Sequence, residues 1–141
     1  MATLSEISEA IDAAKEAGAS DITIMHCVSA YPTPLESTML DNIRILREEF
    51  DLDVGFSDHT EGLEAATLAS VMGATVIVKH FTISRADEGV DSKFSLEPKE
   101  LRQLVDTIQQ ATVSPAGACT IFGFIGARAI TAPPLLLGVA I

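Results

Sequence analysis

The protein has 141 residues, of which 48% are hydrophobic, and a formal net charge of −11 at pH 7. A chain of this length is long enough for one domain with a real hydrophobic core. Its negative charge offers no bulk attraction to a polyanion, so a nucleic-acid partner is not expected.

The first two predicted elements are a helix over residues 4–17 and a strand over residues 22–28. The helix has apolar residues at steps of three and four, a T-x-x-E capping box at residues 3–6, and Gly18 at its end. The strand, ITIMHCV, is apolar without alternation, which is typical of a strand covered on both faces in a parallel sheet. His26 lies inside this run and is interpreted as a core residue.

The following elements alternate between helix and strand up to residue 110. They are a helix from about 34–37 to 50, a strand at 53–57, a helix at 62–72, a strand at 75–81 and a helix at 97–110. This order with short links predicts right-handed crossovers and a parallel sheet.

Residues 111–141 break this pattern. They contain one charged side chain, Arg128, and several Gly and Pro, and they sustain neither a helical nor a strand period. A membrane span is disfavoured, because Arg128 and the Pro133–Pro134 pair leave no uninterrupted apolar stretch of about 18 to 20 residues. We therefore expect a folded domain over residues 1–110 and an atypical, apolar and poorly ordered tail over 111–141.

Polar side chains gather where the predicted strands end. They are Ser29 and Tyr31 after the first strand, Ser57, Asp58 and His59 at the second, and Lys79 and His80 at the third. Parallel α/β sheets and (β/α)8 barrels keep their active sites at this end of the strands. The sequence therefore predicts one rim that carries both His59 and His80.

Two neutral imidazoles on adjacent strands can hold a divalent metal ion that acts as a Lewis acid. The spacing of His59 and His80, 21 residues apart, matches no compact zinc motif. Structural histidines or general acid–base histidines therefore remain open alternatives on spacing alone.

Each of the other polar residues at the strand ends and in the loop after the third strand has one possible functional role and one purely structural role. Ser57 could contact a phosphate or form a simple turn. Lys79 could bind an anionic substrate or point to solvent. Asp87, Glu88 and Asp91 lie in the loop after the third strand and could bind hydroxyl groups or be merely solvated.

The strings HCVSAYPTP, VGFSDHT, GATVIVKHFT and SRADEGVDSKFSLEP occur in this order and together resemble the sialic acid (N-acetylneuraminate) synthase family. That family includes pseudaminic and legionaminic acid synthases, and the resemblance covers about residues 1–110. It implies a barrel enzyme that condenses phosphoenolpyruvate with an N-acyl hexosamine to a nine-carbon 2-keto acid and phosphate, usually with Mn²⁺ or Mg²⁺. The expected fold class is α/β, a partial (β/α)8 TIM barrel of about three parallel strands and four helices that lacks the N-terminal half.

The resemblance also implies roles for single residues. His59 and His80 match the two metal-binding histidines of the family and, with Tyr31, would form the catalytic set. Ser57 matches a phosphate-contacting serine, Asp91 matches an aspartate that contacts sugar hydroxyls, and Ser29 and Tyr31 fall on positions that approach the phosphoenolpyruvate and metal region. Ser29, Ser57 and Asp91 are therefore expected to bind substrate, and Lys79 is added to them because its side chain could supply a cation to an anionic substrate.

Three departures from the family pattern bear on activity. Val78 stands where the family usually has glutamate, and valine can neither accept a hydrogen bond nor move a proton. The first half of the barrel is not represented, and the antifreeze-like C-terminal domain is replaced by the tail. The alternative hypothesis is a non-catalytic truncated remnant that at most associates with other barrel pieces.

The resemblance and the composition give further expectations. The serine after Asp91 looks slightly more like pseudaminic acid synthases than neuraminate or legionaminate enzymes. Cys27 and Cys119 lack CxxC spacing, and the N-terminus lacks a signal-peptide pattern, so a reducing cytoplasm without a membrane partner is expected. The family is typically homodimeric, and pairing with a missing half-barrel is possible.

Overall fold

The computed structural model of the chain describes residues 2–111, 119–125, 128–129 and 136–140. Its helices are α1 (Leu4–Glu16), the 3-10 helix η1 (Leu35–Ser37), α2 (Asp41–Phe50), α3 (Glu64–Val71) and α4 (Pro98–Ala111). Its strands are β1 (Thr23–Cys27), β2 (Asp53–Asp58), β3 (Val76–His80), β4 (Thr120–Ile125), β5 (Arg128–Ala129) and β6 (Leu136–Ala140). Every helix and strand predicted within residues 1–110 is present.

The start of the second predicted helix differs from the prediction. The segment expected to be continuous from about residue 34–37 is divided into η1 and α2, with Met39 between them in a left-handed conformation at a φ of 48°. A left-handed residue cannot continue a right-handed helix, so α2 begins only at Asp41.

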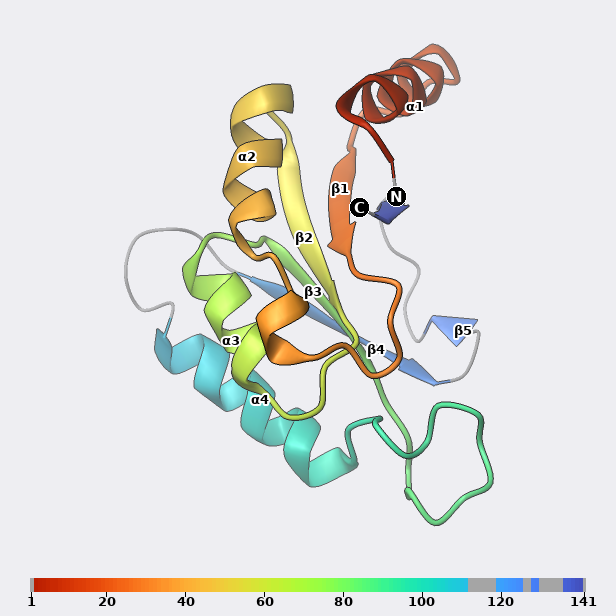
Figure 1. Cartoon of the computed structure of the whole chain (residues 1–141), viewed down its shortest axis with the longest axis vertical. Coiled ribbons are helices and arrows are strands. Elements are labelled where there is room, and N and C mark those ends of the chain that lie inside the picture. Colours follow the sequence, from red (N-terminus) through yellow and green to blue (C-terminus); the bar gives the residue numbers. More distant parts are fainter. Residues whose placement is uncertain (1, 112–118, 126–127, 130–135, 141) are drawn as a thin grey trace.

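The strands form one six-stranded sheet in the order β5-β4-β3-β2-β1-β6 (Figure 1). All neighbouring pairs are parallel except β4 and β5, which are antiparallel. The predicted parallel order of β1, β2 and β3 is therefore confirmed.

Three strands lie in the segment that was expected to be a poorly ordered tail. β4 pairs with the free edge of β3, and β6 pairs with the free edge of β1. Unpaired strand edges present free backbone donors and acceptors, which explains how a segment without a side-chain period can form strands there. The other residues to which the expectation of poor order applies, 112–118, 126–127, 130–135 and 141, lie outside the described ranges.

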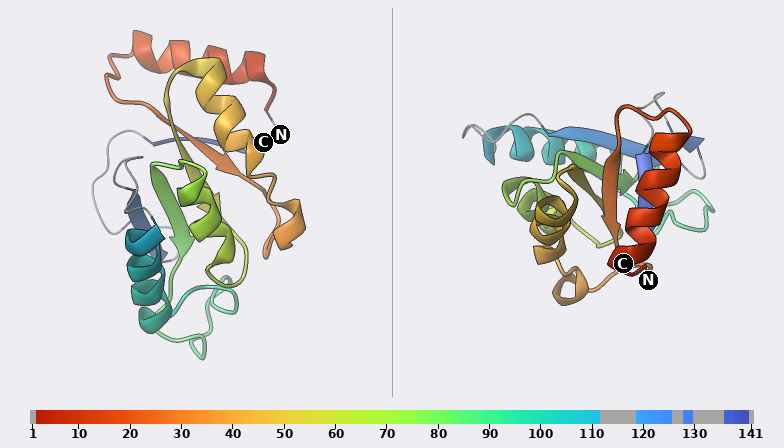
Figure 2. Two further views of the ribbon diagram at one scale, coloured as in Figure 1. Left: turned by 90° about the vertical axis from the view of Figure 1, so that its left-hand side faces the viewer. Right: turned by 90° about the horizontal axis from the view of Figure 1, so that it is seen from above.

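The helices cover one face of β1–β3. In Figure 1, α2, α3 and α4 follow one another along the same side of the sheet, and the left view of Figure 2 shows them in the same succession, with α1 across the top. Side chains from the helices and the strands form one core, which includes Ile7, Ile11, Ile24, Ile43, Leu46, Val54, Phe56, Ile77, Leu104 and Ile108. None of the helices in the described part of the chain has the length and hydropathy that a membrane crossing requires.

Strand register assigns side chains to the two faces of the sheet. His26 pairs with Phe56, and Phe56 pairs with Ile77, in a row that faces the helices. Since neighbouring residues in a strand point to opposite faces, Cys27, Ser57 and Val78 form a row on the other face. That second face leads directly to the strand ends where the candidate site lies.

Candidate functional site

The site is built at the carboxyl ends of β1, β2 and β3. His59 follows β2 directly, and His80 is the last residue of β3. Because β2 and β3 are parallel neighbours, their carboxyl ends lie at the same edge of the sheet. The two histidines therefore lie on one rim, as the sequence predicted.

His59 is held by the loop that follows β1. Its ring Nδ1 lies 2.9 Å from the carbonyl oxygen of Val28, and we assign the Nδ1 proton to this bond, which leaves a lone pair on Nε2. The His59 carbonyl accepts a hydrogen bond from the Thr33 N–H at 2.9 Å. Both the ring and the backbone of this residue are therefore fixed, and the side chain is only 5% exposed.

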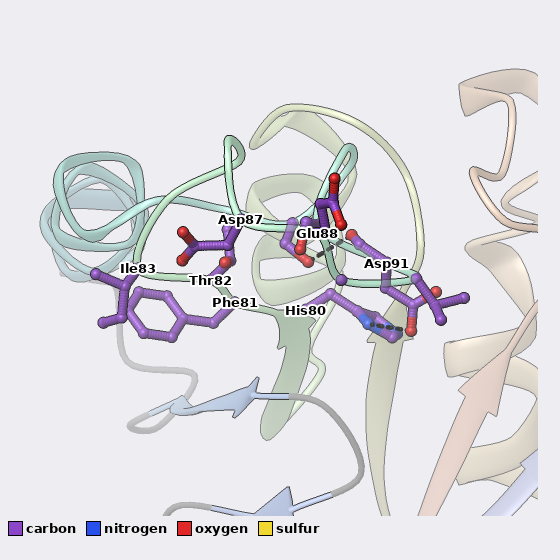
Figure 3. Close-up of a pocket in the computed structure, with 11 residues that line it drawn as sticks. His80, Phe81, Thr82, Ile83, Asp87, Glu88 and Asp91 are labelled. Atoms are coloured by element: carbon purple, nitrogen blue, oxygen red, sulfur yellow. Dashed lines mark hydrogen bonds and ion pairs between the residues drawn. The ribbon is translucent and has the colours of Figure 1, made fainter.

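His80 is held from the loop that precedes α4. Its Nδ1 lies 3.5 Å from Oδ2 of Asp91, a contact drawn in Figure 3, and its carbonyl accepts from the Leu96 N–H at 2.9 Å. Partial burial lowers the pKa of His80, nearby His59 and Lys79 lower it further, and Asp91 opposes them. The neutral imidazole, which is the form that binds metal ions, is thereby favoured.

The two imidazole rings are close enough to bind one ion. Their centroids lie 5.2 Å apart at an interplanar angle of 66°. A metal–imidazole bond is about 2 Å long, so two rings that share an ion have centroids no more than about 6 to 7 Å apart. Within the described residues no group of three or more His, Cys, Asp or Glu side chains could hold a metal ion, so further ligands would have to come from water, substrate or another segment.

Aromatic rings surround the histidine pair. The ring of Tyr31 lies 4.2 Å from that of His59 and 5.9 Å from that of His80, measured between centroids. Phe94 lies 5.1 Å from His80. Partial desolvation, together with Cys27 and Asp91, raises the pKa of Tyr31 above its ordinary value of 10.0, so its hydroxyl stays neutral at physiological pH.

Ser57 also lies at the site, at the end of the row on the face of the sheet opposite the helices. Its Oγ is 3.4 Å from Nε2 of His59, and its strand neighbours in register are Cys27 and Val78. Burial raises the pKa of the Cys27 thiol, although the hydroxyls of Ser57 and Ser29 oppose the shift. Ser29 is exposed in the loop that follows β1.

The structure places Lys79 away from the rim and so corrects the expectation that it faces substrate or solvent. The side chain is 1% exposed, and its Nζ lies 2.8 Å from Oδ2 of Asp58. Lys79 is in register with Asp58. It lies on the helix-covered face because neighbouring residues in a strand point to opposite faces and His80, the next residue, points to the rim side. Its charge is already balanced inside the protein.

A pocket of about 550 Å³ opens beside His80. It is lined by the loop after β3, which supplies Asp87, Glu88 and Asp91 (Figure 3). Arg85 ties this loop to α4: its Nε donates to the Ser95 carbonyl at 3.0 Å, and its guanidinium pairs with Glu100. The loop is thus held in place with its acidic residues around the pocket.

Sequence reasoning missed three residues at or behind the site: Cys27, Asp58 as the partner of Lys79, and Phe94. The first two follow from strand alternation, since Cys27 aligns with Ser57 and Asp58 aligns with Lys79. Phe94 lies in an irregular loop, where no periodic signal identifies the direction of a side chain.

Comparison with known proteins gives one consistent family. The sequence model of the NeuB family matches residues 1–118. The chain is similar to the N,N'-diacetyllegionaminic acid synthase of Campylobacter jejuni, with 44% identity over 112 residues that cover 78% of this chain and 34% of that protein. It is also similar to a pseudaminic acid synthase of Campylobacter jejuni, with 40% identity over 111 residues, covering 79% of this chain and 32% of that protein.

A solved structure matches the same part of the chain. It is the crystal structure of an N-acetylneuraminic acid synthetase from Leptospira borgpetersenii in complex with citrate, which superposes with a TM-score of 0.74 at 37% identity and covers 79% of this chain and 39% of that chain. This match confirms the predicted fold class, a part of a (β/α) barrel. The chain spans about a third of the length of the curated relatives that it matches.

Proposed function

The chain belongs to the NeuB family, and from this premise we propose that it supplies the C-terminal half of the barrel of a nonulosonic (sialic-type) acid synthase. The proposed reaction condenses phosphoenolpyruvate with an N-acyl hexosamine to give a nine-carbon 2-keto acid and phosphate. The observation that carries the proposal is the convergence of His59 and His80 at the ends of neighbouring parallel strands, with ring centroids 5.2 Å apart.

The donor set fits a divalent cation. His59 donates its Nδ1 proton to the Val28 carbonyl, and Nδ1 of His80 faces Asp91, which is the outer-shell arrangement typical of metal-binding histidines. Of the two cations that the family resemblance implies, Mn²⁺ fits imidazole nitrogen better than Mg²⁺, which is bound mainly by oxygen. A bound cation would polarise the aldehyde of the open-chain sugar and so favour attack by C3 of phosphoenolpyruvate.

The chain's own residues would hold the two substrates around this point. The Ser57 hydroxyl, beside His59, can donate a hydrogen bond to a phosphate oxygen, and Ser29 is exposed on the same rim. The Asp91 carboxylate lines the pocket beside His80 and can accept hydrogen bonds from sugar hydroxyls. The Tyr31 ring packs against both imidazoles and would keep water from that side of the reacting groups.

The charge around the rim determines which of the two substrates the pocket beside His80 can bind. Among the described residues the pocket beside His80 is lined by three carboxylates and no cationic side chain, while Lys79 is paired internally with Asp58. This arrangement suits a polyhydroxylated neutral sugar and repels a phosphate or carboxylate. Binding of phosphoenolpyruvate would therefore depend on the cation and on cationic groups from the remainder of the barrel.

The preferred sugar is part of the proposal. We favour the pseudaminate precursor among N-acyl hexosamines, because a serine, Ser92, follows Asp91 in the loop. Ser92 is 8% exposed and lines the pocket beside His80, so it is placed to influence which sugar substituent fits there.

A chimaera tests this function. Residues 1–118 would replace the matching segment of the Campylobacter jejuni N,N'-diacetyllegionaminic acid synthase, once with Val78 and once with Val78→Glu. We expect a folded chimaera to release phosphate from phosphoenolpyruvate only when an N-acyl hexosamine and Mn²⁺ are present, and His59→Ala to abolish the release. The N-acyl hexosamine precursors of pseudaminate, legionaminate and neuraminate would be compared to establish specificity.

The same assay evaluates the alternative, a non-catalytic remnant. That reading is motivated by Val78, which lies in the row next to Ser57 at the position where the family resemblance implies glutamate. Folded chimaeras that release no phosphate with either residue at position 78 would exclude a synthase function for this segment. Release only with Val78→Glu would locate the defect at that one residue.

A further inference from the structure

Behind the two histidines, on the helix-covered face, lies a buried ion pair. Nζ of Lys79 is 2.8 Å from Oδ2 of Asp58, and the two side chains are 1% and 0% exposed. The ammonium group also donates to the carbonyl and hydroxyl of Thr60, at 2.6 and 3.4 Å, and Oδ1 of Asp58 accepts from the Thr60 N–H at 2.8 Å. Both carboxylate oxygens and all three ammonium protons therefore have partners.

The pair is located immediately next to both candidate metal ligands. Asp58 and Lys79 are the last residues in register between β2 and β3. His59 lies between Asp58 and Thr60 in the chain, and His80 follows Lys79. These hydrogen bonds therefore connect Asp58 and Thr60, the two chain neighbours of His59, to Lys79, the residue before His80. The two imidazoles themselves point to the opposite face of the sheet, because side chains alternate along a strand.

Stability alone is a weak explanation for this pair. Burying two charges carries a large desolvation penalty, and apolar replacements of buried ion pairs are often neutral or stabilising. Fixed geometry is a stronger explanation, because charge-assisted hydrogen bonds at 2.6 to 2.8 Å tolerate little sliding of one strand end past the other. Such sliding would change the distance between the two imidazoles.

We propose that Lys79 and Asp58 are positioning residues that set the separation of His59 and His80 and, through it, the affinity of the rim for a divalent cation. The inference rests on the proposed function, since the two imidazoles are the ligands that it assigns. It gives Lys79 a role behind the site, in place of contact with substrate.

The test uses the full chain carrying Asp58→Asn and Lys79→Met together. Asparagine keeps the acceptor for the Thr60 N–H, and methionine keeps the length of the lysine side chain, so no unpaired charge is left in the core. We expect the double variant to fold, to bind Mn²⁺ about 10- to 100-fold more weakly, and to show weaker nuclear Overhauser effects between the His59 and His80 ring protons in the absence of metal. Ile11→Val, a core change in α1, is the control that alters stability and leaves both measurements unchanged.

The two readouts separate failure of this inference from failure of the proposed function. If the wild-type chain does not bind Mn²⁺, the metal assignment fails, while the metal-free ring contacts still test positioning. Unchanged ring contacts in the double variant overturn the inference. Should that variant not fold, Asp58→Glu keeps both charges and lengthens the carboxylate arm by one carbon, and the same change in ring contacts is expected.

Discussion

The chemistry of each residue near the rim depends on which face of its strand it occupies. His26 and Lys79 face the helices, whereas His59 and His80 lie at the rim on the opposite face. The sequence predicted the rim position of the two site histidines, because strand ends could be located from the apolar runs. It also carried the signal for Lys79: a residue adjacent to His80 in a strand must point to the opposite face.

His26 gives a prediction about pH and stability. Burial lowers its pKa, and the hydrogen bond from its ring to the Thr38 carbonyl, at 2.7 Å, opposes the shift. The unfolded chain therefore binds a proton that the folded chain does not, so stability is fully present above the ordinary histidine pKa of 6.5 and is lost as the pH falls towards the lowered folded value.

The measurement compares urea unfolding midpoints of the wild type and His26→Gln between pH 7.5 and pH 5. Glutamine can still donate to the Thr38 carbonyl but does not titrate, so we expect a shallower loss of stability with acidification in the variant. Other groups, including His80 and the carboxylates, are common to both proteins. Identical pH profiles would show that His26 does not contribute.

Val78 gives a prediction about metal affinity. It lies two residues before His80, on the same face of β3 and in register with Ser57. Val78→Glu would bring a carboxylate to the histidine pair, so we expect Mn²⁺ affinity to rise about tenfold or more, because an anionic oxygen is a good ligand for that ion. Val78→Gln, of equal length but uncharged, is the matched control and should give a much smaller gain. Equal effects of the two substitutions would mean that position 78 acts through size alone.

Among the elements, β2 places the site most directly. Gly55 pairs with Met25 in β1 and lies on the face opposite the helices, two residues before Ser57. A Cβ at this position would lie 2.8 Å from the Val76 carbonyl oxygen and would collide with the Met25 side chain. The absence of a side chain at Gly55 therefore lets β1, β2 and β3 lie close together a few residues before the strand ends that carry the two histidines.

Gly55→Ala is expected to destabilise the fold by about 1 to 3 kcal/mol, because the backbone of β3 cannot move away cheaply. It should also shift the His59 and His80 ring resonances. Gly18→Ala is the control: Gly18 has a φ of 94° and open space around it, so it should lower the melting temperature through backbone conformation alone and leave those resonances in place. Unaltered resonances in Gly55→Ala would contradict this role of β2.

At the scale of the whole molecule, sequence reasoning predicted the order and parallel arrangement of β1, β2 and β3, because each is an apolar run of strand length that lies between two helical segments. It did not predict β4 and β6, since these strands are defined by backbone pairing with the free edges of β3 and β1. It also did not predict how the loop of residues 83–95 folds back on His80, because that loop is held by specific contacts such as those of Arg85 with Ser95 and Glu100. Non-local hydrogen bonds of this kind leave no period in the sequence.

The most direct test of the shared metal site is a Mn²⁺ titration of the full chain, monitored by electron paramagnetic resonance. We expect the wild type to bind one Mn²⁺ per chain, His59→Ala and His80→Ala each to weaken binding at least about tenfold, and the double variant to lose it. His26→Gln, which changes the histidine outside the rim, should bind like the wild type. Wild-type affinity in the His59→Ala/His80→Ala variant would contradict a cation site shared by these two imidazoles.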